Sequence, residues 1–159
     1  MYDEKDNKFL ERAIEISRQG MKSGQGGPFG CVIVLGDEII GEGCNQVTSS
    51  NDPTAHAEVV AIRQACNKLG TYQLTDCDIY TSCEPCPMCL GAIYWARPKR
   101  VIYANTREEA AAIEFDDDFI YGEIIAKMED RKIPFLHLPH PMAKEVFEAW
   151  KNWEGKIKY

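Results

Sequence analysis

Hydrophobic and polar positions along the chain follow two different periods. Over residues 6–23 apolar side chains recur at helical spacing with charges between them, at Phe9, Leu10, Ala13, Ile14, Ile16 and Met21. Residues 29–35 and 39–45 instead form two short apolar, β-branched runs on either side of the turn Gly36-Asp37-Glu38, which predicts a hairpin. The chain is therefore expected to begin with a helix and two antiparallel strands.

The rest of the pattern alternates between helices and strands. Asp52 can cap a helix and Pro53 suits its first position, so a helix is expected to run from there to about Leu69, where Gly70 ends it. Further strands are predicted at 78–82, 100–104 and 133–138, and further helices at 86–96, 106–112, 119–128 and 143–153. This order favours a single α/β domain, residues 1–159, with parallel strands in its second half.

Composition and charge narrow the choice of partner. The chain has 159 residues, of which 45% are hydrophobic and 27% charged, as in a soluble domain with a proper core. Its net charge of −7 argues against nucleic acid, although the run 97–100 is basic, and favours a small substrate. No apolar run reaches the roughly 20 residues of a membrane span, and the first residues lack the apolar core of a signal peptide.

Cysteine usage indicates the redox environment of the protein. The seven cysteines are an odd number, and two of them stand in a C-x-x-C motif. Without a secretion signal, this favours reduced thiols and a metal site over a disulfide framework, and hence a cytoplasmic protein.

Two motifs carry the chemistry. His56-Ala57-Glu58 is an H-x-E motif, and Pro85 to Cys89 is a P-C-x-x-C motif, the combination that a zinc deaminase needs. Cys86 and Cys89 open a predicted helix, whose positive end favours thiolates, and His56 supplies a third ligand. Three protein ligands with an open position for water are typical of catalytic zinc, which lowers the pKa of that water to about 7. We therefore expect one Zn²⁺ with a bound water or hydroxide.

Two other interpretations of the cysteines stay open. The zinc could be structural, with Cys83, Cys77 or His137 as its fourth ligand, or Cys86 and Cys89 could be ordinary buried cysteines. Cys83 is expected at the end of a strand, ahead of the helix that aims the other two. The H-x-E motif at the head of another helix weighs against both alternatives.

Glu58 has a separate role from the ligands. Two residues after His56 on a helix, it cannot chelate in the same direction, but it can reach the bound water. There it can take a proton as general base and return it to a leaving nitrogen as general acid. The alternative is a glutamate that faces solvent.

Longer runs carry a resemblance to a known family. They are residues 26–30, 48–58, 80–99 and 115–121, together with the terminal Tyr159. On these runs the chain resembles the small bacterial guanine deaminases of the cytidine-deaminase-like zinc deaminase superfamily, over nearly its whole length. The tRNA adenosine deaminases share the His-Ala-Glu and Glu-Pro-Cys-x-Met-Cys motifs, so those alone do not separate the two.

The resemblance implies a fold, a reaction and an assembly. The fold would be a three-layer α/β/α sandwich around a mixed five-stranded sheet. Zinc, one per subunit, would sit on His56, Cys86 and Cys89, with Glu58 as proton shuttle, and guanine would be hydrolysed to xanthine and ammonia. The assembly would be a homodimer that exchanges residues from about 115 to 159 between its subunits.

The resemblance also implies a base pocket. Phe29 would stack on the base, Asn45 would form hydrogen bonds to it, and Ala57 and Trp95 would lie beside it. A purine pocket does call for aromatic, amide and carboxylate groups. The alternatives are core packing for Phe29 and Trp95, and a turn cap for Asn45.

Two residues of the C-terminal part would complete the pocket. Asp117 and Tyr159 would enter the active site of the partner subunit, with Asp117 holding the base and assisting proton transfer. On the residues alone, a solvated acidic turn is the preferred interpretation of 116–118, and a frayed end that of Tyr159. Glu114 departs from the pattern, because a small residue such as Gly is expected before the acidic run, and this bears on the loop around Asp117.

Other functions remain open at this stage. The same chemistry would serve a deaminase of guanosine, tRNA adenosine, cytosine or an aminotriazine. A different class, a non-catalytic zinc module that binds a partner, would show four protein ligands and no metal-bound water.

Overall fold

The computed structural model describes residues 4–115 and 117–159. Contacts within the chain divide it into two compact units, Met1–Asp118 and Phe119–Tyr159. The two units are described separately below. No helix of the described residues is long and apolar enough to cross a membrane.

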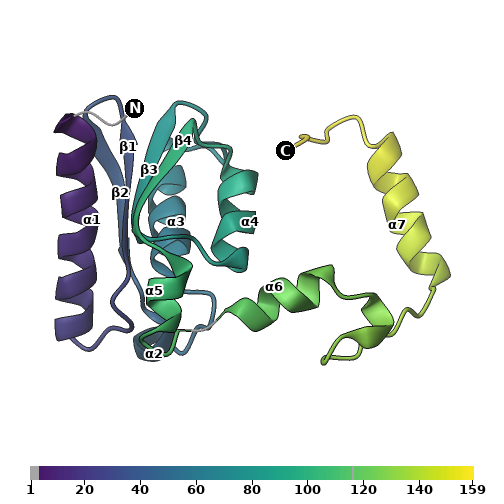
Figure 1. The fold of residues 1–159 in the computed structure, drawn as a ribbon. Coiled ribbons are helices and arrows are strands. Elements are labelled where there is room, and N and C mark those ends of the chain that lie inside the picture. The colour runs from purple at the N-terminus through teal and green to yellow at the C-terminus, as the bar shows by residue number, and fades with distance from the viewer. Residues whose placement is uncertain (1–3, 116) are drawn as a thin grey trace. The chain divides into compact units, whose positions relative to one another are not determined.

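The first unit is built on a mixed sheet (Figure 1). Its four strands are β1 (Gly30–Leu35), β2 (Glu38–Cys44), β3 (Cys77–Cys83) and β4 (Arg100–Asn105), in the order β2-β1-β3-β4. β1 pairs antiparallel with both β2 and β3, whereas β3 and β4 are parallel. The predicted hairpin and the parallel pair are both confirmed.

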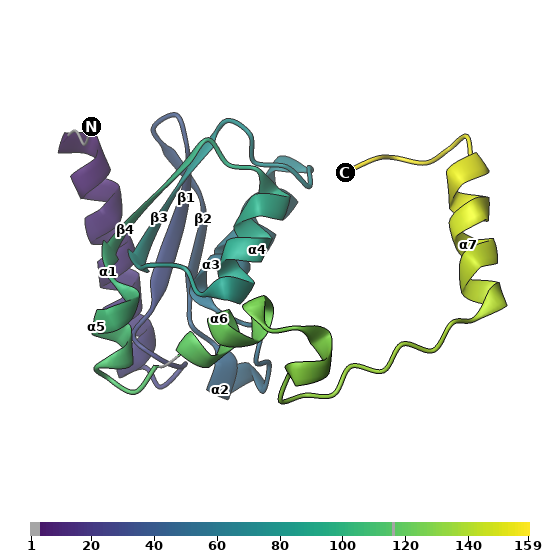
Figure 2. The ribbon, with the colours of Figure 1, turned by 45° about the vertical axis from the view of Figure 1, so that its right-hand side comes forward.

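Helices cover both faces of this sheet (Figures 1 and 2). α1 (Glu4–Lys22) packs on one face, while α3 (Ala57–Leu69) and α4 (Pro87–Ala96) pack on the other. Side chains alternate along β1, so Val32 belongs to the apolar cluster under α1, and Cys31 and Ile33 belong to the cluster under α3. The expected three-layer α/β/α fold is confirmed.

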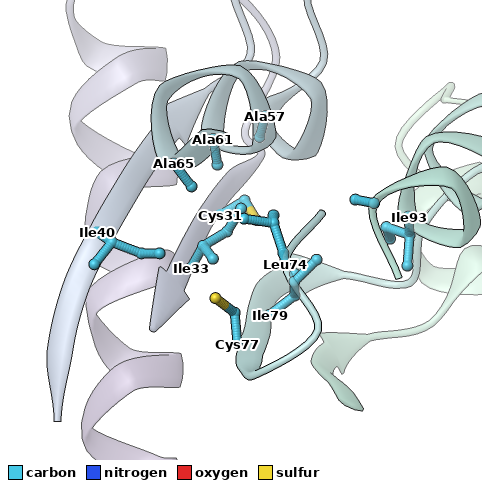
Figure 3. Close-up of a cluster of buried hydrophobic side chains, with 11 residues drawn as sticks. Cys31, Ile33, Ile40, Ala57, Ala61, Ala65, Leu74, Cys77, Ile79 and Ile93 are labelled. Carbon is cyan, nitrogen blue, oxygen red and sulfur yellow. The ribbon is translucent and has the colours of Figure 1, made fainter. Parts of the chain in front are cut away.

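Close packing fixes the start of α3, which carries part of the site. The helix turns Ala57, Ala61 and Ala65 toward the sheet, where all three are fully buried (Figure 3). Opposite them, a Cβ on Gly41 or Gly43 of β2 would run into the backbone of α3. Small residues on both sides thus let the helix lie directly on the strand, which fixes the position of its N-terminus.

α1 is attached to the sheet by a buried charge. Asp6 accepts hydrogen bonds from Arg100 Nη1 at 3.0 Å and Nη2 at 2.7 Å, and from the Tyr80 hydroxyl at 2.7 Å. Phe9 packs beside it, with its ring 5.4 Å from that of Tyr80. This network joins the first turn of α1 to β3 and β4.

The predicted start of the second long helix was wrong. α3 begins at Ala57, with His56 as its N-cap, and not at Pro53. Asp52 instead closes a local turn, because its carboxylate accepts from the Thr54 backbone N–H at 2.8 Å and from the Thr54 hydroxyl at 2.7 Å. A short helix that the pattern did not predict, α2 (Val47–Ser50), precedes this turn.

Two further elements lead to the end of the first unit. α5 (Arg107–Ala111) is opened by a capping box, in which Thr106 and Glu109 each bond the other's backbone N–H. Glu114 follows in the left-handed region, with φ of 71°. α6 (Asp118–Ile125) then continues into the second unit.

The second unit holds a 3₁₀ turn, η1 (Met128–Asp130), and α7 (Pro141–Asn152). The strand expected at 133–138 is wrong. Residues there pair with no strand among the described residues, and Leu136 and Leu138 are 92% and 85% exposed. The described chain therefore forms four strands and not the five that the resemblance implied.

Candidate active site

Two helix N-termini bring the three proposed zinc ligands together. His56 is the N-cap of α3, Cys86 is the N-cap of α4, and Cys89 lies in the first turn of α4. Their ligand atoms all lie within 4.8 Å of one another, and His56 Nδ1 is 3.5 Å from each sulfur. The positive ends of both helices favour negative charge at this point.

The ligand set suits a cation. A hydrogen bond from Cys89, helped by His56, lowers the pKa of the Cys86 thiol to about 4. The same hydrogen bond and burial raise the pKa of Cys89. A divalent cation bound among these three ligand atoms would stabilise both thiolates. One nitrogen and two sulfur ligands suit zinc.

Cys83 and Cys77 do not join this group. Cys83 ends β3, and its thiol donates to the Thr106 carbonyl oxygen at 3.7 Å. Burial, followed by the charge of Glu58, raises the pKa of Cys83 to about 11, so it stays a neutral thiol. Among the described residues, three protein ligands converge here, the number that a catalytic zinc site requires.

Glu58 is buried beside the ligands and does not face solvent. It is 6% exposed, its Oε1 accepts from the Thr81 hydroxyl at 3.3 Å, and its Oε2 accepts from the Cys89 thiol at 3.3 Å. Burial raises the pKa of this carboxyl. A buried carboxyl next to a metal site can act as general base and then as general acid.

A cavity of about 420 Å³ opens in front of these groups. It is lined entirely by residues of the first unit: Gly27, Phe29, Asn45, Val47, Thr48, His56, Glu58, Cys83, Glu84, Cys86, Arg107, Ala110, Glu114, Phe115 and Asp117. Its volume lies in the range of small-molecule pockets. The cavity thus joins the ligand cluster to the residues expected to bind a base.

Asn45 presents a hydrogen-bond donor to this cavity. Its Oδ1 accepts from the backbone N–H of Gly27 at 3.3 Å and from that of Val47 at 3.2 Å. Two donors require an oxygen at that position, so the orientation of the amide is fixed and the Nδ2 group is the one left for a ligand. The side chain is 5% exposed, which makes this orientation hard to change.

Aromatic and acidic side chains form the opposite wall. Phe29 and Phe115 meet nearly edge to face, with ring centroids 4.8 Å apart and planes at 89°. Asp117 lies in the wall of the cavity of its own chain. Burial, followed by the nearby Cys86 thiolate, raises the pKa of Asp117.

Two residues expected at the base do not line the cavity. Ala57, the first residue of α3, faces the sheet and is fully buried. Trp95 is 63% exposed on α4 and lies outside the cavity wall. Tyr159, which was expected in the partner's site, belongs to the second unit, where it is 68% exposed.

The sequence also missed some wall residues. Phe115, Arg107 and Glu84 were given no role, although Phe115 and Glu84 stood in runs that supported the resemblance. Arg107 and Glu84 meet through a hydrogen bond of 3.2 Å from the Arg107 backbone N–H to the Glu84 carboxylate. Nothing in the local pattern could have predicted that contact.

Comparisons with known proteins agree with this geometry. Residues 3–105 match the family model of the cytidine and deoxycytidylate deaminase zinc-binding region. The guanine deaminase of Bacillus subtilis is 58% identical over 151 residues, which is 95% of this chain and 97% of that protein. The X-ray structure of the B. subtilis guanine deaminase superposes with a TM-score of 0.94 at 57% identity, covering 96% of this chain and 98% of that one.

A tRNA deaminase is a more distant relative. The tRNA-specific adenosine deaminase of Buchnera aphidicola is 36% identical over 153 residues, 96% of each chain. The family model and the sequence relatives thus agree on a zinc-binding deaminase. The chain belongs to the cytidine and deoxycytidylate deaminase zinc-binding family.

Proposed function

We propose that this chain is a zinc-dependent guanine deaminase that hydrolyses guanine to xanthine and ammonia. The observation that carries the proposal is the single cavity that joins the ligand cluster and Glu58 to Phe29, Asn45 and Asp117. The high identity to the B. subtilis guanine deaminase along nearly the whole chain supports the same substrate.

His56, Cys86 and Cys89 would hold one zinc ion per chain, which would supply the Lewis acid that makes water a nucleophile near neutral pH. Glu58 is not a ligand, but its Oε2 lies 3.3 Å from Cys89 Sγ and so reaches the same space. The carboxylate takes a proton from the attacking water and passes it to the amino nitrogen. The oxygen of that water ends on C2 of the base, and the nitrogen leaves as ammonia.

The rest of the cavity suits a guanine base. Phe29 offers a ring for stacking, and the fixed Asn45 amide offers an N–H to one of the acceptors on the guanine edge. Asp117 offers a carboxylate to a ring N–H. Donor and acceptor together match a base that carries both on its edges.

We further propose a homodimer that exchanges its C-terminal units. No described residue of the second unit is buried, and α7 exposes Val146, Phe147 and Trp150. A segment with this much exposed apolar surface needs a partner to be stable. Because Asp117 lines the cavity of its own chain, the proposed exchange begins after it, and Tyr159 is the residue that would enter the partner's site.

The assembly is tested by sedimentation of the full chain and of a chain that ends at Asp118. The full chain should sediment as a dimer and the shortened chain as a monomer or an aggregate. A full chain that is monomeric at micromolar concentration would contradict the exchange, without bearing on the zinc chemistry.

The substrate is tested by ammonia release with the zinc-loaded full chain. Guanine, guanosine, cytosine and a tRNA anticodon stem-loop are compared at equal concentration. We expect guanine to have the highest kcat/KM by at least about 100-fold. Faster turnover of guanosine or the RNA would keep the reaction class and overturn the substrate, and no turnover of any substrate with zinc bound would favour a non-catalytic module.

A further inference from the structure

We infer that Phe115 is a positioning residue of this site, which holds Asp117 in the cavity by packing on Phe29 and Gly27. The inference rests on the proposed function, because it concerns how the same cavity is assembled. Phe115 stands two residues before Asp117, and both line the cavity wall.

The first support is the contact between the two rings. Phe29 precedes β1 and Phe115 follows α5, so they come from distant parts of the chain, yet their centroids are 4.8 Å apart at 89°. An edge-to-face pair of this kind has a preferred geometry and resists displacement of either ring. The loop after α5 is thereby attached to the rigid sheet.

The second support is the glycine beneath the pair. A Cβ on Gly27 would lie 2.8 Å from Phe115 Cζ and 3.1 Å from Phe29 Cε2. A side chain at this position would therefore force the rings apart. The backbone N–H of Gly27 also holds the oxygen of Asn45, so one residue of the loop supports both the amide and the aromatic wall.

The third support is the backbone just before Phe115. Glu114 has φ of 71°, a left-handed conformation that is unfavourable for a residue with a side chain. Such a conformation persists only where the surrounding structure holds it. Two backbone hydrogen bonds do so, from Phe115 N to the Ala110 carbonyl at 3.1 Å and from Glu114 N to the Ala111 carbonyl at 3.0 Å. The backbone of Phe115 is thereby fixed to the end of α5, which directs its ring onto Phe29.

Together these contacts make the place of Asp117 depend on Phe115. Asp117 itself is half-buried, and its described surroundings are the cavity wall. If the Phe115 ring is removed, the loop loses its attachment to Phe29 and the carboxylate loses its fixed place. An error of about 1 Å in such a group can lower the rate by about 100-fold.

The test is a double-mutant cycle on guanine turnover by the zinc-loaded full chain, with Phe115→Ala, Asp117→Asn and both together. We expect Phe115→Ala alone to lower kcat/KM by about 10- to 100-fold, mostly in kcat. In the Asp117→Asn background the same change should cost less than about threefold, because the group that it positions is already gone. A residue with only a structural role would give effects that multiply.

Matched variants keep the test informative if Phe115→Ala folds poorly. Phe115→Leu retains apolar bulk and should keep more activity than the alanine variant, while Gly27→Ala should push the ring away and lower kcat. Tyr72→Ala, at an aromatic residue 52% exposed and away from the cavity, should leave kcat unchanged. Melting temperature and zinc content are measured on each variant.

Two results would overturn the inference. One is full activity of Phe115→Ala, and the other is a loss that multiplies with that of Asp117→Asn. Both require a wild-type chain that turns over guanine. An inactive wild type with zinc bound would contradict the proposed function instead, and the two failures are therefore distinguishable.

Discussion

The two faces of the sheet both bury polar groups, but they use them differently. On the α1 face Asp6 is 2% exposed, and its carboxylate accepts from Arg100 and Tyr80 through hydrogen bonds of 2.7–3.0 Å. On the α3 and α4 face Glu58 and Asn45 are 6% and 5% exposed, and both line the open cavity. Asn45 is held by its oxygen alone, whereas Glu58 accepts from two neutral groups, the Thr81 hydroxyl and the Cys89 thiol.

The difference distinguishes buried polar groups that stabilise the fold from buried polar groups that can bind a ligand. A buried carboxylate bound on both oxygens by a guanidinium contributes to stability and has nothing left to offer a ligand. A buried amide whose oxygen is fixed by two backbone N–H groups has its donor ready for a substrate. Burial alone therefore does not identify a functional residue. A functional residue is identified by a buried polar group that remains available to a ligand.

Metal removal should have the largest effect on activity, and it acts only on the α3 and α4 face of the sheet. Chelation takes away the Lewis acid, so guanine turnover should fall below detection and return on addition of Zn²⁺. The melting temperature should fall as well, because a bound metal stabilises the folded state. Metal content, turnover and melting are measured on one sample, and full activity of the stripped protein would contradict the account.

Reversing the donor at Asn45 should give the next largest effect. Asn45→Asp keeps an oxygen for the Gly27 and Val47 N–H groups but turns an acceptor toward the base. We expect kcat/KM for guanine to fall by about 100-fold or more, and further than in Asn45→Ala, since unlike the alanine it repels the acceptor on the base. Steady-state kinetics of both variants decide this, and an aspartate variant better than the alanine variant would contradict the proposed orientation.

Removing the charge on the α1 face should affect stability and not chemistry. Asp6→Ala leaves the Tyr80 hydroxyl and Arg100 without their buried acceptor, so the free energy of unfolding should fall by about 1–3 kcal/mol. Arg100 is 40% exposed and can be hydrated, which places the expectation toward the lower end. Urea unfolding measures the change.

The control for this variant is Asp37→Ala, which removes an exposed ion pair with Lys5. Its melting temperature should not change measurably. Both variants should keep the wild-type kcat for guanine at temperatures where they are folded. A kcat lowered tenfold in Asp6→Ala would show that the two faces are not independent.

The smallest effect is expected at Cys83. Its thiol is neutral and donates to the Thr106 carbonyl, so Cys83→Ala should bind one zinc per chain and change kcat by less than about threefold. Metal analysis after dialysis measures the occupancy. Loss of zinc would instead identify Cys83 as a fourth ligand and favour the structural-zinc alternative.

The sequence predicted that His56, Cys86 and Cys89 come together, because the relevant information is local. Cys86 and Cys89 stand one turn apart at the start of α4, and His56 and Glu58 stand at the start of α3, so two short motifs define four groups. The order of strands and helices was equally accessible. The start of α3 was not, since the turn closed by Asp52 competes with helix at the same residues.

The base pocket depends on contacts between distant segments, and there the sequence was less informative. The Phe115 ring is held by packing on Phe29, and the Asn45 amide is oriented by a hydrogen bond from the Gly27 N–H. Hydrophobic periodicity predicts neither contact. Trp95 was expected at the base from residue type and resemblance, yet it lies on the exposed side of α4.

The strand predicted at 133–138 illustrates a different limit. Its alternating apolar residues do suit a strand, but a strand forms only where a neighbouring strand provides backbone hydrogen-bond partners. Within the described residues of the second unit there is none, and the side chains stay exposed. Such a segment is what the proposed exchange between two copies would have to cover.

The most direct measurement is guanine turnover by the Glu58→Gln variant together with its zinc content. Glutamine keeps the size of the side chain and a hydrogen bond with Thr81, but it cannot carry the proton. The account predicts one zinc per chain, unchanged affinity for guanine within about threefold, and a kcat lowered by about 100- to 10,000-fold. A variant that keeps its zinc and turns over guanine at the wild-type rate would contradict the central claim that this buried carboxylate transfers the proton.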